Sequence, residues 1–379
     1  MQGIRSEITS ENTVYDIGYQ EVDPIDINAT YDCVILPMAN IFSEVFLRFM
    51  TRRTDFLKKI EIPVYVIACG LQCRSKDELP GLIEKIGKES KEFIDVVYAT
   101  GGEFCLRGNT TKEFFDMLGN NSAVVTGCPS MFQMGRNLKI SNEKVDRETF
   151  KASLNGSFNL PISRQDFQKC DFIDQDRYIE MLFRPNYLAS HPINFRTVLS
   201  DVAYRGYVYS QSLADRRIKA FLDTQQWMRY FEVEDIDFSF GSRIHGTIMP
   251  ILSGVPSMIV PCDARTREMA EFFDIPMYDS KSQKNCDLYE LYCQTDYTKF
   301  NENFTSRYDA FEDFLVDHNI VDRINPSNIY MQKNNASTIM PPNVNNDYFM
   351  AYAQCFNKNR FFLYSADTVV KLMRRVKRR

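Results

Sequence analysis

The sequence alternates short runs of apolar, strand-forming residues with longer amphipathic stretches over most of its length. This alternation is typical of parallel α/β sheets, because each helix returns the chain to the edge where the next parallel strand begins. Strands are predicted at residues 31–36, 62–68, 104–107, 123–127, 204–209, 236–240 and 257–260. Helices are predicted over residues 41–60, 82–98, 213–231, 247–253, 265–273 and 300–318, and a capping box at Thr110 and Glu113 is expected to begin a further helix that ends at Gly119.

These elements form two successive blocks. A polar, lysine-containing stretch at about residues 136–150 separates them, and 379 residues suffice for two domains that each bury a core. We therefore predict an α/β protein with two Rossmann-like domains and an inter-domain cleft. The predicted segments are an N-terminal domain over residues 1–145, a C-terminal domain over residues 146–323, and a polar extension with a basic tail over residues 324–379.

The composition is that of an ordinary soluble globular protein, with 44% hydrophobic and 25% charged residues. A net charge of −5 gives no broad electrostatic attraction to nucleic acid, and no nucleic-acid partner is expected. Neither an N-terminal apolar run nor the ~20 consecutive apolar residues of a membrane span occurs, so a cytoplasmic location is expected.

The sequence contains no pattern typical of a metal site. The ten cysteines lack a C-x-x-C pair or a ligand-like spacing, and reduced thiols are expected. Two Asp-x-Asp pairs occur, Asp174/Asp176 and Asp235/Asp237, without a histidine or a further carboxylate to complete a ligand set. We therefore predict a reaction that uses no metal and no other cofactor.

A segment from Asp237 to Thr247 carries the strongest functional signal. Its first part alternates apolar residues and predicts a half-buried strand, and the polar residues Ser242, Arg243 and His245 follow where a helix should begin. In open α/β sheets ligands bind beyond the carboxyl ends of strands, and helix N-termini favour anions. An arginine and a histidine at that point indicate an anionic substrate and a proton transfer.

The same segment carries a family resemblance. Gly241-Ser242-Arg243-Ile244-His245-Gly246, followed by Ser253-Gly254-Val255-Pro256, resembles the signature of polysaccharide pyruvyltransferases. Asp263-Ala264-Arg265 and the strand end Cys105-Leu106-Arg107-Gly108 are similar to further parts of that family's pattern. The resemblance extends from about Tyr31 to His318 and is densest from Asp235 to Pro276. The chain lacks the family's usual glycine-containing opening, Asn-x-Gly-Asp, so an atypical or missing first βα unit is expected.

The resemblance implies a GT-B-like pair of domains and transfer of a pyruvyl group from phosphoenolpyruvate. The acceptor would be two hydroxyls of a sugar in a polysaccharide or lipid-linked glycan precursor, which form a cyclic ketal while phosphate leaves. His245 would be the general acid, because the methylene carbon of the donor must take a proton before a hydroxyl attacks. Planar guanidinium groups suit the donor's carboxylate and phosphate. The substrate-binding residues would be Arg243, Arg107, Ser242, Gly246 and Arg265.

Structural roles and other functions remain alternatives. His245 can be a hydrogen-bonded structural residue, Arg107 a solvated cation, and Arg265 a surface partner beside a helix cap at Asp263. His318 is expected in a surface role at a helix C-terminus. The same architecture would also serve a nucleotide-sugar glycosyltransferase or a noncatalytic glycan- or anion-binding protein.

The last nine residues, 371–379, contain six cations and no acidic residue. One interpretation is a solvated run of charge. The other is peripheral contact with the anionic inner face of the cytoplasmic membrane, where each cation near the surface contributes about 1 kcal/mol.

Overall fold

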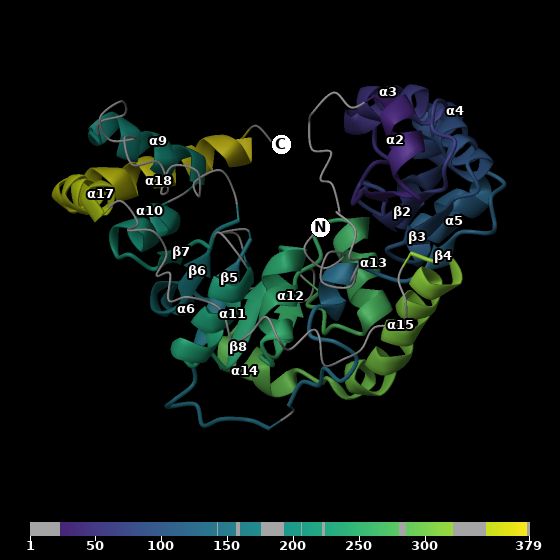
Figure 1. Ribbon diagram of the computed structural model, residues 1–379. Coiled ribbons are helices and arrows are strands. Elements are labelled where there is room, and N and C mark those ends of the chain that lie inside the picture. Colours follow the sequence, from purple (N-terminus) through teal and green to yellow (C-terminus); the bar gives the residue numbers. More distant parts are fainter. Residues whose placement is uncertain are drawn as a thin grey trace. The chain divides into compact units, whose positions relative to one another are not determined.

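The computed structural model describes residues 23–141, 143–156, 160–175, 193–205, 207–221, 224–279, 286–320 and 346–376. The chain forms two compact units (Figure 1). Unit 1 comprises Met1–Lys139, Pro261–Met277 and Tyr297–Asn334, and unit 2 comprises Ile140–Val260, Tyr278–Asp296 and Asn335–Arg379. Each unit contains one parallel sheet, which confirms the α/β class. The GT-B-like arrangement of the two units stays a prediction.

The sheet of unit 1 has the strand order β1-β2-β3-β4, and all its described pairs are parallel. Its strands are β1 (Val34–Pro37), β2 (Val64–Cys69), β3 (Glu103–Leu106) and β4 (Val124–Val125). The helices are α2 (Pro24–Thr30), η1 (Glu44–Phe46), α3 (Leu47–Leu57), η2 (Lys76–Glu78), α4 (Leu79–Ala99), α5 (Asn109–Met117), η3 (Pro129–Phe132), α13 (Ala264–Phe273) and α15 (Thr298–Asp317).

The core of unit 1 is built on β2, which is buried at every position. Phe42 is fully buried, and its ring lies 5.3 Å from each of Phe114 and Phe115 of α5 and 6.1 Å from Phe93 of α4. Aromatic pairs at these separations add stability beyond the burial of their area. The packing fixes α4 and α5 against the sheet and so fixes where β3 ends.

The sheet of unit 2 has the strand order β7-β6-β5-β8-β9, again with parallel pairs. Its strands are β5 (Ala152–Asn155), β6 (Asp171–Ile173), β7 (Ile218–Lys219), β8 (Phe238–Gly241) and β9 (Ser257–Ile259). The helices are α6 (Arg164–Lys169), α9 (Phe195–Arg205), α10 (Tyr207–Ala214), α11 (Thr224–Val233), α12 (Ile244–Leu252), α14 (Leu288–Gln294), α17 (Asn346–Lys358) and α18 (Arg360–Val376). The order reverses between β5 and β8, and such a switch point is where ligands bind in open parallel sheets.

Two elements of unit 2 differ from the sequence-based prediction. The strand predicted at 204–209 is wrong, because residues 204 and 205 end α9 and residues 207–209 begin α10. Tyr207, Tyr209 and Leu213 are all buried, so the aromatic run that favours a strand is a helix enclosed on most sides. The long helix predicted over 213–231 is interrupted by β7.

Burial and helix capping also correct two local predictions. β8 is buried at all four positions rather than half-buried, because it lies between β5 and β9 inside a parallel sheet. The capping box predicted at Thr110 and Glu113 is absent. The N-cap residue of α5 is Gly108 instead of Thr110, and a glycine has no side chain to cap the helix. The predicted end of α5 is confirmed by Gly119, which adopts a φ of +80° just beyond the helix.

The two units are not contiguous in sequence, unlike the predicted domains. α13 and α15 belong to unit 1, where the ring of Phe132 packs on Phe273 of α13 and stacks on Phe311 of α15. The segment expected to be a polar extension contributes α17 and α18 to unit 2, next to α9 and α10 (Figure 1). Tyr352 and Leu363 are fully buried there, so part of this extension is core.

Candidate functional site

The loop after β8 leads directly into α12. The helix begins at Ile244, three residues before the predicted start, and Arg243 is its N-cap residue with φ −97° and ψ 127°. His245 therefore lies in the first helical turn, where backbone N–H groups have no partner within the helix and favour an anion. The side chains of Arg243 and His245 are exposed, while Ser242 and Gly246 are buried.

Asn155, the last residue of β5, holds this loop in place. Its side-chain Oδ1 accepts a hydrogen bond from the backbone N–H of Arg243 at 3.0 Å. Its carbonyl oxygen accepts another from the backbone N–H of Ser242 at 3.2 Å. Asn155 is fully buried, so one residue of β5 fixes the position of both polar residues that follow β8, Arg243 through its side chain and Ser242 through its backbone.

Glycines allow the loop to approach Asn155 this closely. Gly156 has a φ of +86°, and a Cβ there would lie 2.3 Å from Oγ of Ser242. A Cβ on Gly246 would lie 2.4 Å from Cγ of Asn155 and 2.5 Å from Nε2 of Gln175. Gly246, predicted as a substrate-binding residue, thus has a steric reason to be glycine.

Two buried amide groups meet at this edge of the sheet. Nδ2 of Asn155 and Nε2 of Gln175 are both inaccessible to solvent, and neither has a hydrogen-bond acceptor among the described residues. Gln175 follows β6 and Asn155 ends β5, so both stand at carboxyl strand ends beside the start of α12. Sequence reasoning missed both residues, although the Asn155-Gly156 pair is a turn signal.

Substituting Gly246 with alanine tests this close packing. We expect Gly246→Ala to lower the free energy of unfolding by about 1–3 kcal/mol, because the new Cβ overlaps two buried amides. Gly81→Ala is the matched control: its Cβ meets nothing within 4 Å in α4, and a gain of about 0.5–1 kcal/mol is expected. Urea denaturation of both variants measures the difference, and equal effects would contradict the tight loop.

Arg107 lies at the carboxyl end of β3 in unit 1. Its backbone N–H donates to the carbonyl oxygen of Cys69 at 2.8 Å, and its side chain is buried with the residue only 4% exposed. The guanidinium Nη2 lies 3.8 Å from Sγ of Cys128, and Nε has no partner within the described part of the chain. No carboxylate of the described residues lies within 4.0 Å of it. Its charge acts on the buried carboxyl of Glu268 without a direct ion pair. Because a buried charge is costly unless it is directly paired, this guanidinium is suited to a bound anion.

The start of α13 lies next to this arginine. Asp263 caps α13 by accepting from the backbone N–H of Thr266 at 2.8 Å, which confirms the capping role expected for Asp263. Nη2 of Arg265 lies 3.3 Å from Oδ2 of Asp263. Arg265 is therefore partly engaged by its own helix cap, as in the alternative interpretation, and its Nε has no hydrogen-bond partner among the described residues.

Glu268 connects α13 to α5. It is 1% exposed, and its carboxylate accepts hydrogen bonds from the backbone N–H and from Oγ1 of Thr111, each at 2.9 Å. It therefore caps α5 from another helix, in place of the capping box predicted within α5. Burial raises the pKa of Glu268 to about 7, while Thr111 and the positive charge of Arg107 oppose the increase.

The raised pKa of Glu268 makes stability depend on pH. In the unfolded chain this carboxyl releases its proton at about 4.5, and in the folded chain at about 7. Between these values the folded state holds one proton more, so the free energy of unfolding falls as pH rises and levels off above pH 7. At about 1.4 kcal/mol per pKa unit the decrease is about 3 kcal/mol. We expect Glu268→Gln to lose this part of the pH dependence in urea denaturation from pH 4.5 to 8; parallel curves for both proteins would contradict it.

The remaining sequence candidates have structural contacts or lie elsewhere. Nε2 of His318 lies 2.9 Å from Oε2 of Glu103 and Nδ1 lies 2.8 Å from the carbonyl oxygen of Phe314, at the end of α15. Asp174 is buried and accepts from the hydroxyl of Tyr209 at 3.1 Å. Residues 176 and 191 lie outside the described residues. Over the residues that were searched, no three His, Cys, Asp or Glu side chains gather as metal ligands.

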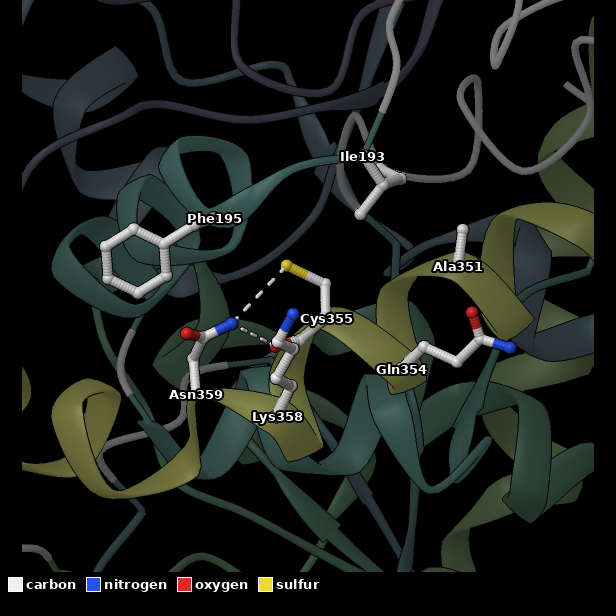
Figure 2. Close-up of a pocket in the computed structure, with 7 residues that line it drawn as sticks. All are labelled: Ile193, Phe195, Ala351, Gln354, Cys355, Lys358 and Asn359. Carbon is white, nitrogen blue, oxygen red and sulfur yellow. Dashed lines mark hydrogen bonds between the residues drawn. The ribbon is translucent and has the colours of Figure 1, made fainter.

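One cavity of unit 2 lies apart from the sheet edge. It has a volume of about 460 Å³ and lies between the beginning of α9 and α17 (Figure 2). Its lining residues are Ile193, Phe195, Ala351, Gln354, Cys355, Lys358 and Asn359. None of the predicted site residues is among them, so this cavity is not the predicted active site.

The structure thus brings the candidates together in two groups. Ser242, Arg243, His245 and Gly246 gather at the switch point of the sheet in unit 2, and Arg107 and Arg265 lie around the start of α13 in unit 1. Both groups place cations at carboxyl strand ends or helix starts. Fold and site define an α/β protein in which each unit carries candidate anion-binding residues at these positions.

Comparison with known families gives the class. Residues 8–263 match the family described as polysaccharide pyruvyl transferase. The chain therefore belongs to this family, which confirms the resemblance and supports a transferase of polysaccharide biosynthesis. The match begins before Tyr31, where the resemblance was placed, and ends just before Arg265. No curated protein and no solved structure matches the chain.

Among the helices searched, none is long and apolar enough to cross a membrane.

Proposed function

We propose that this chain transfers the pyruvyl group of phosphoenolpyruvate to two hydroxyls of a sugar in a polysaccharide or lipid-linked glycan precursor. The product is a cyclic pyruvate ketal, and inorganic phosphate leaves. Family membership supports pyruvyl transfer. The observation that carries the donor assignment is Arg107, a guanidinium buried at a strand end without a carboxylate among the described residues within 4.0 Å.

The arginines bind the donor in this proposal. Arg243 is a donor-binding residue of this proposal, and Arg107 is another, each suited to a carboxylate or phosphate through charge-assisted hydrogen bonds. Arg265, at the start of α13, supplies a further cation. Ser242 and the glycine at position 246 shape the first turn of α12, whose N–H groups have no partner within the helix and add a partial positive charge. The scheme needs no metal and no further cofactor.

His245 is the general acid of this proposal. It protonates the methylene carbon of the donor, and the positive charge that develops at the neighbouring carbon is attacked by the first sugar hydroxyl. The bond from that carbon to the phosphate oxygen then breaks, and the second hydroxyl closes the ketal. Of the two hydroxyl protons, one restores the imidazole and the other leaves with phosphate, so the proton count balances. An exposed histidine in the first turn of α12 can reach a substrate.

Equilibrium binding tests the donor directly. Isothermal titration of the full chain with phosphoenolpyruvate, and separately with UDP, needs no knowledge of the acceptor. We expect phosphoenolpyruvate to bind and UDP to give no heat. Binding of UDP alone would overturn the proposal in favour of a nucleotide-sugar glycosyltransferase. Release of phosphate only when a glycan acceptor is added would distinguish the transferase from a noncatalytic anion-binding protein.

A further inference from the structure

Glu268 is a buried carboxyl that no cation contacts directly. Its two oxygens accept hydrogen bonds from the backbone N–H and the hydroxyl of Thr111, and both donors are neutral. Among the described residues, no lysine, arginine or histidine nitrogen lies within 4.0 Å of this carboxyl. Because burial without a direct ion pair disfavours the charged form, Glu268 is suited to gain or release a proton near neutral pH.

The hydroxyl of Thr111 fits both protonation states of Glu268. A hydroxyl donates a hydrogen bond to a carboxylate oxygen, and it accepts one from a protonated carboxyl. Oγ1 of Thr111 lies 2.9 Å from Oε1 and 3.0 Å from Oε2 of Glu268, so this bond persists whichever group carries the proton. Glu268 can therefore change its charge without a change in packing.

Gly108 holds Glu268 next to the anion-binding candidate of unit 1. This glycine follows Arg107 and is the N-cap residue of α5. A Cβ on Gly108 would lie 2.7 Å from Cβ of Glu268 and 3.0 Å from its Oε2, so the glutamate side chain packs directly on the glycine. The charge of Arg107 reaches the carboxyl without direct contact and favours its ionised form. The ionisation of Glu268 therefore depends on whether that positive charge is available.

The other ionisable groups that act on Glu268 are two thiols and a carboxylate. Burial raises the pKa of Cys73 to about 12 and likewise raises the pKa of Cys69, so both thiols keep their protons at neutral pH. Asp263 caps the start of α13 and pairs with Arg265. The charged side chains of neighbouring helices have other partners: Lys112 pairs with Asp116 and Glu113 with Lys76 on α5, and Arg307 of α15 pairs with Asp274. Glu268 is thus the described group beside Arg107 that is suited to take up a proton.

We propose that Glu268 is a positioning residue of the anion site at Arg107 and takes up a proton when an anion binds there. Without an anion, the guanidinium charge stabilises the ionised carboxyl. A bound phosphate or carboxylate engages that charge and adds negative charge of its own, so Glu268 takes one proton from the solvent and becomes neutral. The inference deepens the proposed function, and it rests on the assignment of Arg107 as a donor-binding residue.

The coupling makes the affinity for an anion depend on pH. Without an anion the carboxyl of Glu268 releases its proton at a pKa of about 7, and with an anion bound it releases the proton only at higher pH. As the pH rises above 7, binding therefore requires that a proton be taken up. We expect the affinity to fall about five- to tenfold between pH 6 and pH 8.

Sulfate tests the coupling, because its charge is constant over this range of pH. Isothermal titration of the full chain at pH 7.5, in two buffers of different ionisation enthalpy, gives the number of protons taken up per anion bound. Every protein carries His245→Asn, so that this exposed histidine exchanges no proton. We expect an uptake of about half a proton or more for this reference protein and none after Glu268→Gln is added. The amide of glutamine keeps both hydrogen bonds to Thr111.

Glu113→Gln is the matched control for the substitution of Glu268. Glu113 lies on α5 in the same unit, but its side chain is 39% exposed and pairs with Lys76. Its removal should leave the proton uptake equal to that of the reference protein. Arg107→Met should abolish the sulfate binding that takes up a proton.

Three results would overturn the coupling. These are no proton uptake by the reference protein, equal uptake after Glu268→Gln, or equal uptake after Arg107→Met. If the Glu268→Gln protein does not fold, the reference protein decides alone, because its uptake should vanish at about pH 5.5, where Glu268 is already protonated.

Parallel titration with phosphoenolpyruvate separates the coupling from the proposed function. Proton-coupled sulfate binding without phosphoenolpyruvate binding would overturn the proposed donor and leave the coupling in place. Phosphoenolpyruvate binding without proton uptake would overturn the coupling and leave the proposed function in place. If neither anion bound, both would be overturned, because Arg107 would then hold no anion site.

Discussion

Replacing Arg107 with methionine is expected to abolish measurable phosphoenolpyruvate binding while leaving the chain at least as stable as the wild type. The loss should reach about 2–5 kcal/mol, the range for removing one partner of a desolvated charge contact. This corresponds to a decrease in affinity of roughly 30- to 4,000-fold. Isothermal titration at constant pH measures the affinity, and urea denaturation measures the stability.

The expected stability follows from the surroundings of Arg107 without ligand. The guanidinium is buried, its one described hydrogen-bond contact is the 3.8 Å approach to the Cys128 thiol, and no carboxylate among the described residues lies within 4.0 Å. An apolar side chain of similar length removes the cost of that buried charge, and the free energy of unfolding should be unchanged or increased by about 1–3 kcal/mol. A substitution that weakens donor binding only by disturbing the structure would lower the free energy of unfolding instead.

A surface arginine of the same unit supplies the control. Arg136 forms an exposed ion pair with Asp309 at 2.6 Å, and Arg136→Met should leave donor binding unchanged with a cost in stability of at most about 1 kcal/mol. If Arg107→Met bound phosphoenolpyruvate within twofold of the wild type, Arg107 would be a structural cation. If the Arg107→Met variant unfolded, the guanidinium of Arg107 would stabilise the fold through a contact outside the described residues.

The sequence located the parts of the site that lie next to each other in the chain. Arg107 follows β3 as predicted, and Ser242, Arg243 and His245 follow β8 and begin a helix. These predictions succeed because strand periodicity, turn residues and helix starts are local properties of a few neighbouring residues.

Residues that depend on strand order could not be found in this way. Asn155 lies next to Arg243 only because β5 pairs with β8, which is 86 residues further along the sequence. Gln175 reaches Gly246 because β6 lies on the other side of β5. The burial of Glu268 against Thr111 depends on α13 returning to unit 1. No local pattern encodes any of these three contacts.

Replacing His245 with asparagine is expected to separate turnover from binding. If His245 is the general acid, kcat for phosphate release should fall by about 10²- to 10⁴-fold. Affinity for phosphoenolpyruvate should change by less than about threefold, because asparagine keeps a polar side chain in the first turn of α12 and the arginines are untouched. Acceptor-dependent phosphate release measures the rate, and isothermal titration measures the binding.

His318→Asn is the matched control for this substitution. His318 is the other histidine with a described position, and its ring contacts Glu103 and the end of α15 rather than the start of a helix. Its removal should affect stability and leave kcat unchanged. A wild-type rate in His245→Asn would assign proton donation to another group. A loss of both binding and turnover would make His245 a donor-binding residue, because a proton donor that acts only in the transition state lowers the rate and not the affinity of the ground state.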